Sequence, residues 1–317
     1  MKKGILFALL SAALLSAGCA TADEWPSKTM TIVVPWKAGG GADSAARLVA
    51  KFWEKELGTK FVIENRKGAD GMIGVKYYFT QPADCDHILF FAQPFYSNNI
   101  LSGKAGFAME DTAVINAIEL DPSCLAVNPG KFASFEALNA AIKAQPGQIK
   151  IGVNGSSTHL VLAKLLIERY GWDVKMVYYG GAAESRAALM GGHVDVIATT
   201  LAGCVDEVPV IVGSYQRNAR YPEVPTYGEI VKEENPPLFA TTRYLAVSAK
   251  AAQAYPERYA KLVETMKKTF DSAEFKEALE KAGRQYVSSW HGPEASAKMN
   301  EESYKFAVTY RDVLTGK

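Results

Sequence analysis

Histidine and cysteine, the residues most often used in metal sites, are scarce in this sequence. Among its 317 residues there are four cysteines and four histidines. The histidines are scattered along the chain (His87, His159, His193 and His291). No Cys-x-x-Cys motif or His/Cys cluster with zinc-ligand spacing occurs. We therefore expect neither a metal site nor a cofactor.

Long apolar runs are also missing, apart from one at the start of the chain. Two lysines precede the apolar run 5–15 and small residues follow it, which is typical of a secretory signal peptide. We favour cleavage after residue 22, giving a mature chain that begins at Asp23. The alternative is lipoprotein processing with a lipid anchor at Cys19. No later run reaches the roughly 20 residues needed to cross a bilayer, so we expect a soluble chain outside the cytoplasm.

An excess of charge of either sign is absent. Without residues 1–22 the chain keeps 33 basic and 34 acidic side chains, a net charge of −1. The charges form no basic block, which argues against binding to nucleic acid or to a membrane surface.

Three cysteines remain in the mature chain: Cys85, Cys124 and Cys204. In an oxidising compartment one pair can bridge and the third stays free, but the sequence does not choose the pair. Cys124 lies in an apolar, strand-like run, so we expect it to be a buried thiol.

What the sequence does contain is a strand, a glycine loop and a helix in the stretch 29–58. The β-branched run 32–34 predicts a buried strand, and three glycines follow at 39–41. Asp43 is the expected N-cap of a helix that ends at Gly58. A helix N-terminus behind a glycine loop favours an anion site, although a tight turn without a ligand is the simpler alternative.

More specific motifs are excluded by spacing. The glycines are not followed by Gly-Lys-Ser/Thr, as a nucleotide P-loop requires, and they do not form Gly-x-Gly-x-x-Gly. Ser44 lies inside the expected helix instead of at a nucleophile elbow. His159 has no paired nucleophile in the sequence. We therefore expect binding without catalysis.

The same unit recurs twice. The strand 61–63 leads into a second glycine loop at 64–71, and the strand 149–153 leads into the polar loop 154–159. Further expected strands cover 88–92, 123–127, 174–179, 194–198 and 243–247, with 211–212 as a short additional one. Alternating strands and helices indicate doubly wound parallel sheets, in which ligands bind beyond the carboxyl ends of the strands.

Helices are expected between these strands and throughout the C-terminal part. Ser134 is the expected cap of a helix through residue 143, and Asp271 with Glu274 is the expected capping box of another that ends at Gly283. The other expected helices cover 183–190, 256–270 and, as one long helix, 293–314.

Five segments together resemble a known family. They read WPSKTMTIVVPWKAGGGADSAARLVA, VIENRKGADGMIGV, GSSTHLVLAKLL, GGHVDV and RYPEVPTYGE. In this order and spacing they are similar to the Bug (TctC-type) periplasmic solute-binding proteins of tripartite tricarboxylate transporters. The resemblance covers nearly all of the mature chain.

The resemblance implies a type II periplasmic binding protein, with two doubly wound α/β domains joined by crossing strands. After the signal peptide (1–22), domain 1 comprises 23–124 and 245–317 and domain 2 comprises 125–244. The implied function is capture of a small organic carboxylate by closure of the two domains, and its delivery to membrane transporter subunits. A periplasmic, monomeric protein is implied.

The family's motif positions also imply a set of ligand-binding residues. The first loop contributes Trp36, Ala38, Gly39, Gly40 and Asp43. The second contributes Ala69, Asp70, Gly71 and Met72, and the third strand end contributes Gln93. Domain 2 contributes Ser156, Ser157, Thr158 and His159 from its polar loop, with Thr199 and Thr200 at a strand end.

This sequence departs from the family pattern at positions that bear on the ligand. Trp36 replaces the usual Phe or Tyr, Lys37 replaces a small residue, and Thr199 replaces an aspartate. The stretch between Gly203 and Val208 is about ten residues short of the usual helix. Selectivity is therefore expected at Trp36 and Lys37. We expect Trp36 to be an apolar lid, with packing on the neighbouring helix as the alternative. Lys37 is either a solvated side chain, the simpler interpretation, or a positive charge for a distal carboxylate.

The resemblance also implies that backbone N–H groups hold the carboxylate, which agrees with the lack of an evident arginine near the loops. Two other functions remain open from the sequence: a sensor that signals to a membrane receptor kinase, and an enzyme on the same fold.

Overall fold

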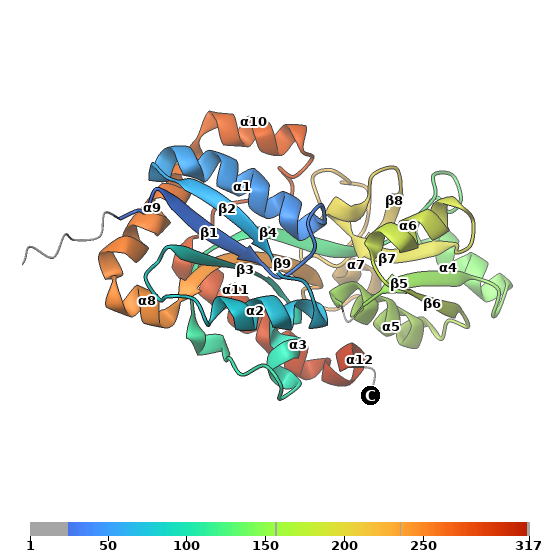
Figure 1. Cartoon of the computed structure of the whole chain (residues 1–317). Helices are drawn as coiled ribbons and strands as arrows, with labels where there is room; N and C mark the ends of the chain where they lie inside the picture. Colours follow the sequence, from blue (N-terminus) through green and yellow to red (C-terminus); the bar gives the residue numbers. More distant parts are fainter. Residues whose placement is uncertain (1–24, 156, 235, 316–317) are drawn as a thin grey trace, which may run out of the picture.

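Two α/β lobes lie side by side in the computed structural model, which describes residues 25–155, 157–234 and 236–315 (Figure 1). The expected signal peptide, including Cys19, lies outside these residues, as does Ser156. Within the described part of the chain, no helix combines the length and the hydrophobicity that crossing a membrane requires.

The first lobe begins with three parallel strands in the order β2-β1-β3. They are β1 (Thr29–Val34), β2 (Lys60–Asn65) and β3 (His87–Gln93). The helices of this lobe are α1 (Gly41–Leu57), α2 (Met72–Tyr78), α3 (Phe95–Leu101), α8 (Ala249–Ala254), α9 (Pro256–Asp271), α10 (Ala273–Lys281) and α11 (Gly292–Thr309). One face of the sheet packs on α1, α9 and α10 and the other on α2 and α3, so both faces are covered, as the apolar strands require.

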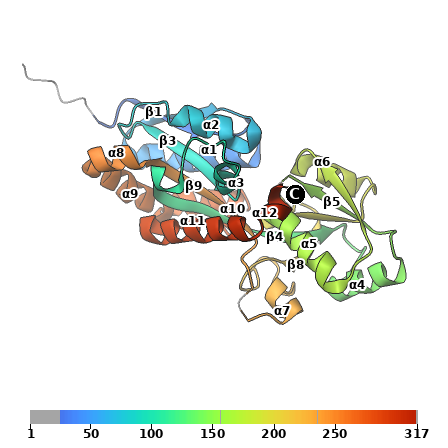
Figure 2. The ribbon, with the colours of Figure 1, turned by 90° about the horizontal axis from the view of Figure 1, so that it is seen from below.

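The second lobe repeats this architecture. Its strands are β5 (Lys150–Asn154), β6 (Lys175–Tyr179), β7 (Val196–Thr200) and β8 (Val208–Val212). Its helices are α4 (Phe135–Ala144), α5 (Thr158–Tyr170), α6 (Ala182–Met190) and α7 (Tyr227–Val231). Figure 2 shows that α11 runs beneath the first lobe and that α12 (Arg311–Thr315) then reaches the second.

Two long antiparallel strands connect the lobes. The strand β9 (Ala240–Ser248) pairs with β3 and with β4 (Thr112–Val127), and the far end of β4 pairs with β7 and β8. The structure is therefore the type II binding-protein fold expected from the resemblance. The expected domain boundaries, 124/125 and 244/245, fall inside β4 and β9. Residues 112–122 of β4 were not expected to form a strand.

Three short 3₁₀ helices also occur, η1 (Ala69–Gly71), η2 (Met109–Asp111) and η3 (Leu201–Gly203). Of these, η1 replaces the end of the second glycine loop. The polar stretch after β3 forms α3.

Most expected helices are confirmed, but three details of their ends are wrong. Gly40, with an extended backbone, precedes α1, so Asp43 lies in the first turn and is not the N-cap. Ser272, whose hydroxyl accepts from Phe275 N, caps α10 in place of Asp271. The expected helix 293–314 is interrupted at Tyr310. The ring centroids of Tyr310 and Phe306 are 4.7 Å apart. The expected cap at Ser134 is confirmed.

Candidate functional site

The glycine loop between β1 and α1 is held from behind by Asp43. Its carboxylate accepts a hydrogen bond from Gly39 N at 2.8 Å, and from Arg47 Nε and Asn65 Nδ2 at about the same distance. Gly39 has a φ of 76°, a conformation that glycine adopts without strain. Asp43 thus fixes the shape of the loop although it is not the helix cap.

The environment of Asp43 keeps it ionised. Burial raises the pKa of its carboxyl, but the hydrogen bonds from Arg47, Gly39 N and Asn65 outweigh burial and lower the pKa below the ordinary value. Asn65 also donates to Trp36 O at 3.0 Å. This network connects β2 to the loop and leaves the N-terminus of α1 open.

A cavity of about 320 Å³ lies in front of this loop, between the lobes. We call it the glycine-loop cavity. From the first lobe and the connecting strands it is lined by Trp36, Lys37, Gly40, Gly41, Ala42, Ala92, Phe95, Asp121, Thr241, Arg243 and Arg284. From the second lobe it is lined by Ala182, Thr199, Thr200, Ala202 and Gly203. The first N–H groups of a helix have no intrahelical partner, so α1 offers donors here.

The second glycine loop supports this cavity from outside. Ala69, Asp70 and Gly71 all have positive φ, and the Asp70 carbonyl accepts from Asn99 Nδ2 at 3.1 Å. A Cβ on Gly71 would lie 3.3 Å from the Trp36 ring. The loop therefore packs behind Trp36.

The Trp36 ring is positioned by other rings as well. It makes edge contacts with Phe90 and Phe95, with ring centroids 6.1 and 6.0 Å apart. Met72 packs instead on the core beneath α2 and α3.

Two arginines form the floor of the glycine-loop cavity, which corrects the expectation that no arginine lies near the loops. Arg243 Nη1 donates to Glu119 Oε2 at 2.7 Å and lies 3.5 Å from Asp121 Oδ2. Arg284 donates to the other oxygen of Glu119. Ala202 N donates to Asp121 Oδ1 at 3.0 Å, which joins this floor to the wall of the second lobe.

Burial and ion pairing act in opposite directions on the pKa values of this cluster. Burial raises the pKa of Asp121, against the opposing effect of Arg243. Burial lowers the pKa of Arg243, but Glu119 and Asp121 outweigh it, so the net shift is upward. Arg243 thus stays cationic, with only 14% of its side chain exposed.

The sequence does hold a signal for this cluster. Arg243 interrupts an otherwise apolar strand. Glu119 and Asp121 are two positions apart in the segment 112–122, so in a strand they would lie on the same face. Because the sequence pattern predicted no strand at 112–122, it offered no ion-pair partner for Arg243. In the structure, Arg243 on β9 pairs in register with Glu119 on β4.

The described residues of the second lobe's polar loop lie at the N-terminus of α5. Ser157 caps α5 by accepting from Leu160 N, and the Thr158 and Ser123 hydroxyls lie 2.8 Å apart. His159 is buried in the first turn of α5. Ser156 lies outside the described residues. None of these described residues lines the glycine-loop cavity, whereas Thr199 and Thr200 do.

The side chain of Gln93 makes hydrogen bonds to two neighbouring helices. Its side chain donates to Asn300 Oδ1 at 2.8 Å and accepts from Ser97 N at 3.2 Å. It thereby joins β3 to α3 and α11. Ala38 is exposed and does not line the cavity.

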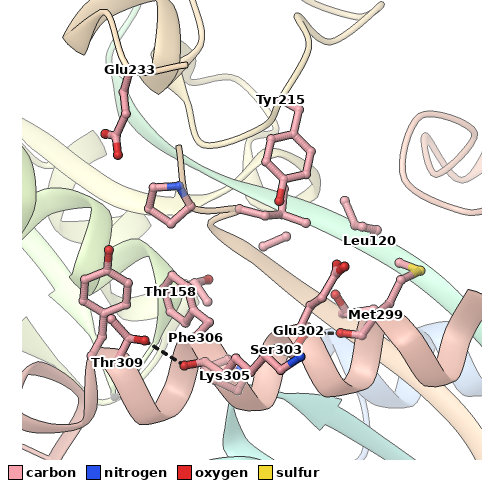
Figure 3. A pocket seen from close by; sticks show the side chains of 16 residues that line it. Leu120, Thr158, Tyr215, Glu233, Met299, Glu302, Ser303, Lys305, Phe306 and Thr309 are labelled. Atoms are coloured by element: carbon pink, nitrogen blue, oxygen red, sulfur yellow. Dashed lines mark hydrogen bonds between the residues drawn. The ribbon is translucent and has the colours of Figure 1, made fainter. Parts of the chain in front are cut away.

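A second cavity, of about 390 Å³, lies on the other face of the connecting strands. Figure 3 shows Tyr215 and Glu233 on one side of it and α11 on the other. We call it the α11 cavity. From the connecting strands it is lined by Leu120, Ala240 and Thr242. Asp121, Thr241 and Arg243 alternate with these residues, so the two cavities lie on opposite faces of the strands. Thr158 lines the α11 cavity.

Neither cavity shows features of a metal centre. In the described ranges, no three His, Cys, Asp or Glu side chains are grouped in a way that could hold a metal ion.

Comparison with known proteins identifies the family. Residues 45–299 match the family model described as "Tripartite tricarboxylate transporter family receptor" (TctC). Protein BugT of Bordetella pertussis is 29% identical over 259 residues, which cover 77% of this chain and 78% of BugT.

Solved structures share the fold. The Rhodopseudomonas palustris protein Rpa4515 with adipate has a TM-score of 0.75 at 21% identity, covering 92% of this chain and 98% of that one. MatC from Rhodopseudomonas palustris with bound malate has a TM-score of 0.70 at 20% identity, covering 91% and 99%. With the family model matching most of the chain, the protein belongs to the TctC family of tripartite tricarboxylate transporter receptors.

Proposed function

We propose that this protein is a periplasmic solute-binding protein that captures a small organic carboxylate in the glycine-loop cavity. One observation carries the proposal: the N-terminus of α1, Arg243 and Arg284 converge on a single cavity between the lobes. Hydrogen bonds to charged groups contribute about 1.5–3 kcal/mol each. Three or four of them are enough for micromolar affinity after ordering costs.

The binding mechanism that we propose is closure of the lobes around the connecting strands. A carboxylate that contacts the first lobe through α1 and Lys37, and the second through Thr199 and Thr200, binds the closed form better than the open form. Its differential affinity then shifts the equilibrium toward closure. Four further motif residues, Gly39, Asp43, Ala69 and Gly71, support this site by shaping the two loops.

Delivery to the membrane subunits of a transporter completes the proposed function. We propose domains at 23–124 with 245–317 and at 125–244, a monomer in solution, and a mature chain that begins at Asp23. Light scattering after size exclusion tests the oligomeric state, and N-terminal sequencing of exported protein tests the cleavage site against processing at Cys19.

The decisive experiment is a thermal-shift screen of the mature protein over mono-, di- and tricarboxylates, aromatic acids and amino acids, followed by calorimetry on the hits. The matched control for each hit is its uncharged diamide or dimethyl ester. We expect stabilisation by an acid and none by its uncharged analogue. A screen in which no carboxylate stabilises the protein, or in which the ester binds equally well, would contradict the proposal.

A further inference from the structure

Two of the three cysteines of the mature chain lie close together. The sulfurs of Cys124 on β4 and Cys204 after η3 are 3.6 Å apart. Both side chains are buried, with exposed fractions of 0% and 2%. A disulfide has an S–S distance of about 2.05 Å, so side-chain rotations that bring the sulfurs about 1.5 Å closer would allow the bond.

The third cysteine occupies a different environment. Cys85 packs in the core of the first lobe with residues of α1 and α9, whereas Cys124 and Cys204 share a small core of the second lobe with Leu189 and Val212. Burial raises the pKa of the Cys85 thiol to about 12, which makes it unreactive. The structure thus distinguishes a pair from an isolated thiol, which the sequence could not do.

We propose that Cys124 and Cys204 form a disulfide in the exported protein, while Cys85 remains a thiol. This inference depends on the extracytoplasmic location in the proposed function, because disulfides persist in oxidising compartments. The oxidant is a protein or small-molecule disulfide. One cysteine thiolate attacks it and forms a mixed disulfide, and the other thiolate then displaces the carrier sulfur. The S–S bond forms, the oxidant's disulfide is reduced to two thiols, and the two protons lost by the cysteines are taken up by those two sulfurs.

Burial of the two thiols indicates that the disulfide forms before folding is complete. In the folded protein the pKa of Cys124 lies well above its ordinary value, because of burial first and then the neighbouring Cys204. A thiol in that state rarely ionises and is shielded from an oxidant. We therefore expect the bond to form while the second lobe is still incompletely packed.

The bond would join a wall of the glycine-loop cavity to the connecting strand. Cys204 directly follows η3, whose Ala202 and Gly203 line the cavity, and Cys124 pairs in register with Thr199. The cross-link spans 80 residues of sequence, among them β5, β6 and β7. It restricts the unfolded chain over most of the second lobe.

Thiol counting with peptide mapping tests the proposal. The full-length gene product is exported, treated with N-ethylmaleimide at harvest, unfolded without reductant and labelled again. We expect one modified cysteine, Cys85, and a linked peptide pair containing Cys124 and Cys204. Cys204→Ser should free Cys124 and give two labels. Three labelled cysteines in the exported wild-type protein would overturn the proposal, as would a linked pair that includes Cys85.

Thermal unfolding gives a second readout in a Cys85→Ser background. A strong reductant should lower the melting temperature of this variant by about 5 °C or more, given the long loop closed. The same reductant should leave the Cys85→Ser/Cys204→Ser protein unchanged. Equal melting temperatures with and without reductant in the first protein would contradict the cross-link.

Carboxylate binding, measured on the same samples, separates this inference from the proposed function. If all three thiols are free in an exported protein that binds a carboxylate, the cross-link fails and the function stands. If the pair is linked but no carboxylate binds, the cross-link stands and the function fails.

Discussion

The two cavities beside the connecting strands share a backbone but differ in charge. Residues 120, 240 and 242 face the α11 cavity, and residues 121, 241 and 243 face the glycine-loop cavity. The charged residues that line the α11 cavity are Glu233, Glu302 and Lys305. Those that line the glycine-loop cavity are Lys37, Arg243, Arg284 and Asp121. Alternation along the two strands thus points the uncharged residues 120, 240 and 242 toward the α11 cavity, and Asp121 and Arg243 toward the glycine-loop cavity, where the N-terminus of α1 also lies.

The largest expected effect follows from replacing Arg243 in the glycine-loop cavity. Arg243→Met leaves Glu119 and Asp121 buried beside an apolar side chain. Breaking a buried ion pair in this way costs about 3–5 kcal/mol, so the free energy of unfolding in urea should fall by about that amount. In the other cavity, Lys305→Met removes an exposed cation that pairs with Glu301 and should cost less than about 0.5 kcal/mol. Similar losses in both variants would contradict the contrast.

Next in size is an effect on binding alone. A Cβ on Gly41 would lie 3.8 Å from Arg243 Nη2, inside the glycine-loop cavity, and its backbone is helical. Gly41→Val should weaken carboxylate binding about 100-fold by calorimetry while the melting temperature of the free protein changes little. Gly71 is a poorer site for this test, because its φ is +90° and a Cβ there would meet Pro35 and Trp36.

The matched control places the same side chain in the α11 cavity. Thr309→Val, which keeps its shape and loses only a bond to Lys305 O, should leave carboxylate affinity within about twofold. If Thr309→Val weakened binding and Gly41→Val did not, the ligand would belong to the α11 cavity.

A smaller effect concerns pH. The pKa of Asp43 is lowered in the folded protein, so its stabilising contribution is complete above the unfolded value of about 4 and is lost as pH falls through the folded pKa. Asp43→Asn should therefore cost about 1 kcal/mol at pH 6 and less below about pH 4, as measured by urea unfolding at each pH. A constant difference from pH 6 to pH 3 would show that the ion pair with Arg47 is not its cause.

The smallest expected effect is spectroscopic. Trp36 is half-buried and lines the glycine-loop cavity, whereas Trp53 is fully buried in the first lobe. Ligand binding should change tryptophan fluorescence, and Trp36→Phe should remove most of that change while affinity shifts less than about fivefold. An undiminished fluorescence change in Trp36→Phe would place the ligand away from this ring.

Local patterns in the sequence were enough to predict the loops but not the floor of the cavity. The glycines and the strands before them are visible in short windows, so the first loop and the repeated βα units were predicted correctly. Asp43 was assigned the wrong role because Gly40 and Asp43 both suit a helix start, and only the backbone of Gly40 decides between them.

The charged floor depends on pairing between distant segments. Residues 112–122 contain Asn116, Glu119 and Asp121, which are unfavourable in a buried strand unless partners exist. Those partners come from far along the chain: Asn116 Oδ1 accepts from His291 N, and Glu119 accepts from Arg243 and Arg284. Local sequence patterns therefore predicted no strand at 112–122 and no arginine near the ligand.

The position of Arg243 on a strand shared by both lobes has a consequence for kinetics. Under the proposed closure, the lobes move about β4 and β9, while Arg243 and its two carboxylates move with the strands as one unit. Because the two carboxylates already offset the charge of Arg243, the attraction for an incoming anion comes from Lys37 and the N-terminus of α1, and it is present in the open form. Association should consequently slow as ionic strength rises, whereas dissociation, which requires the lobes to separate, should respond much less to salt.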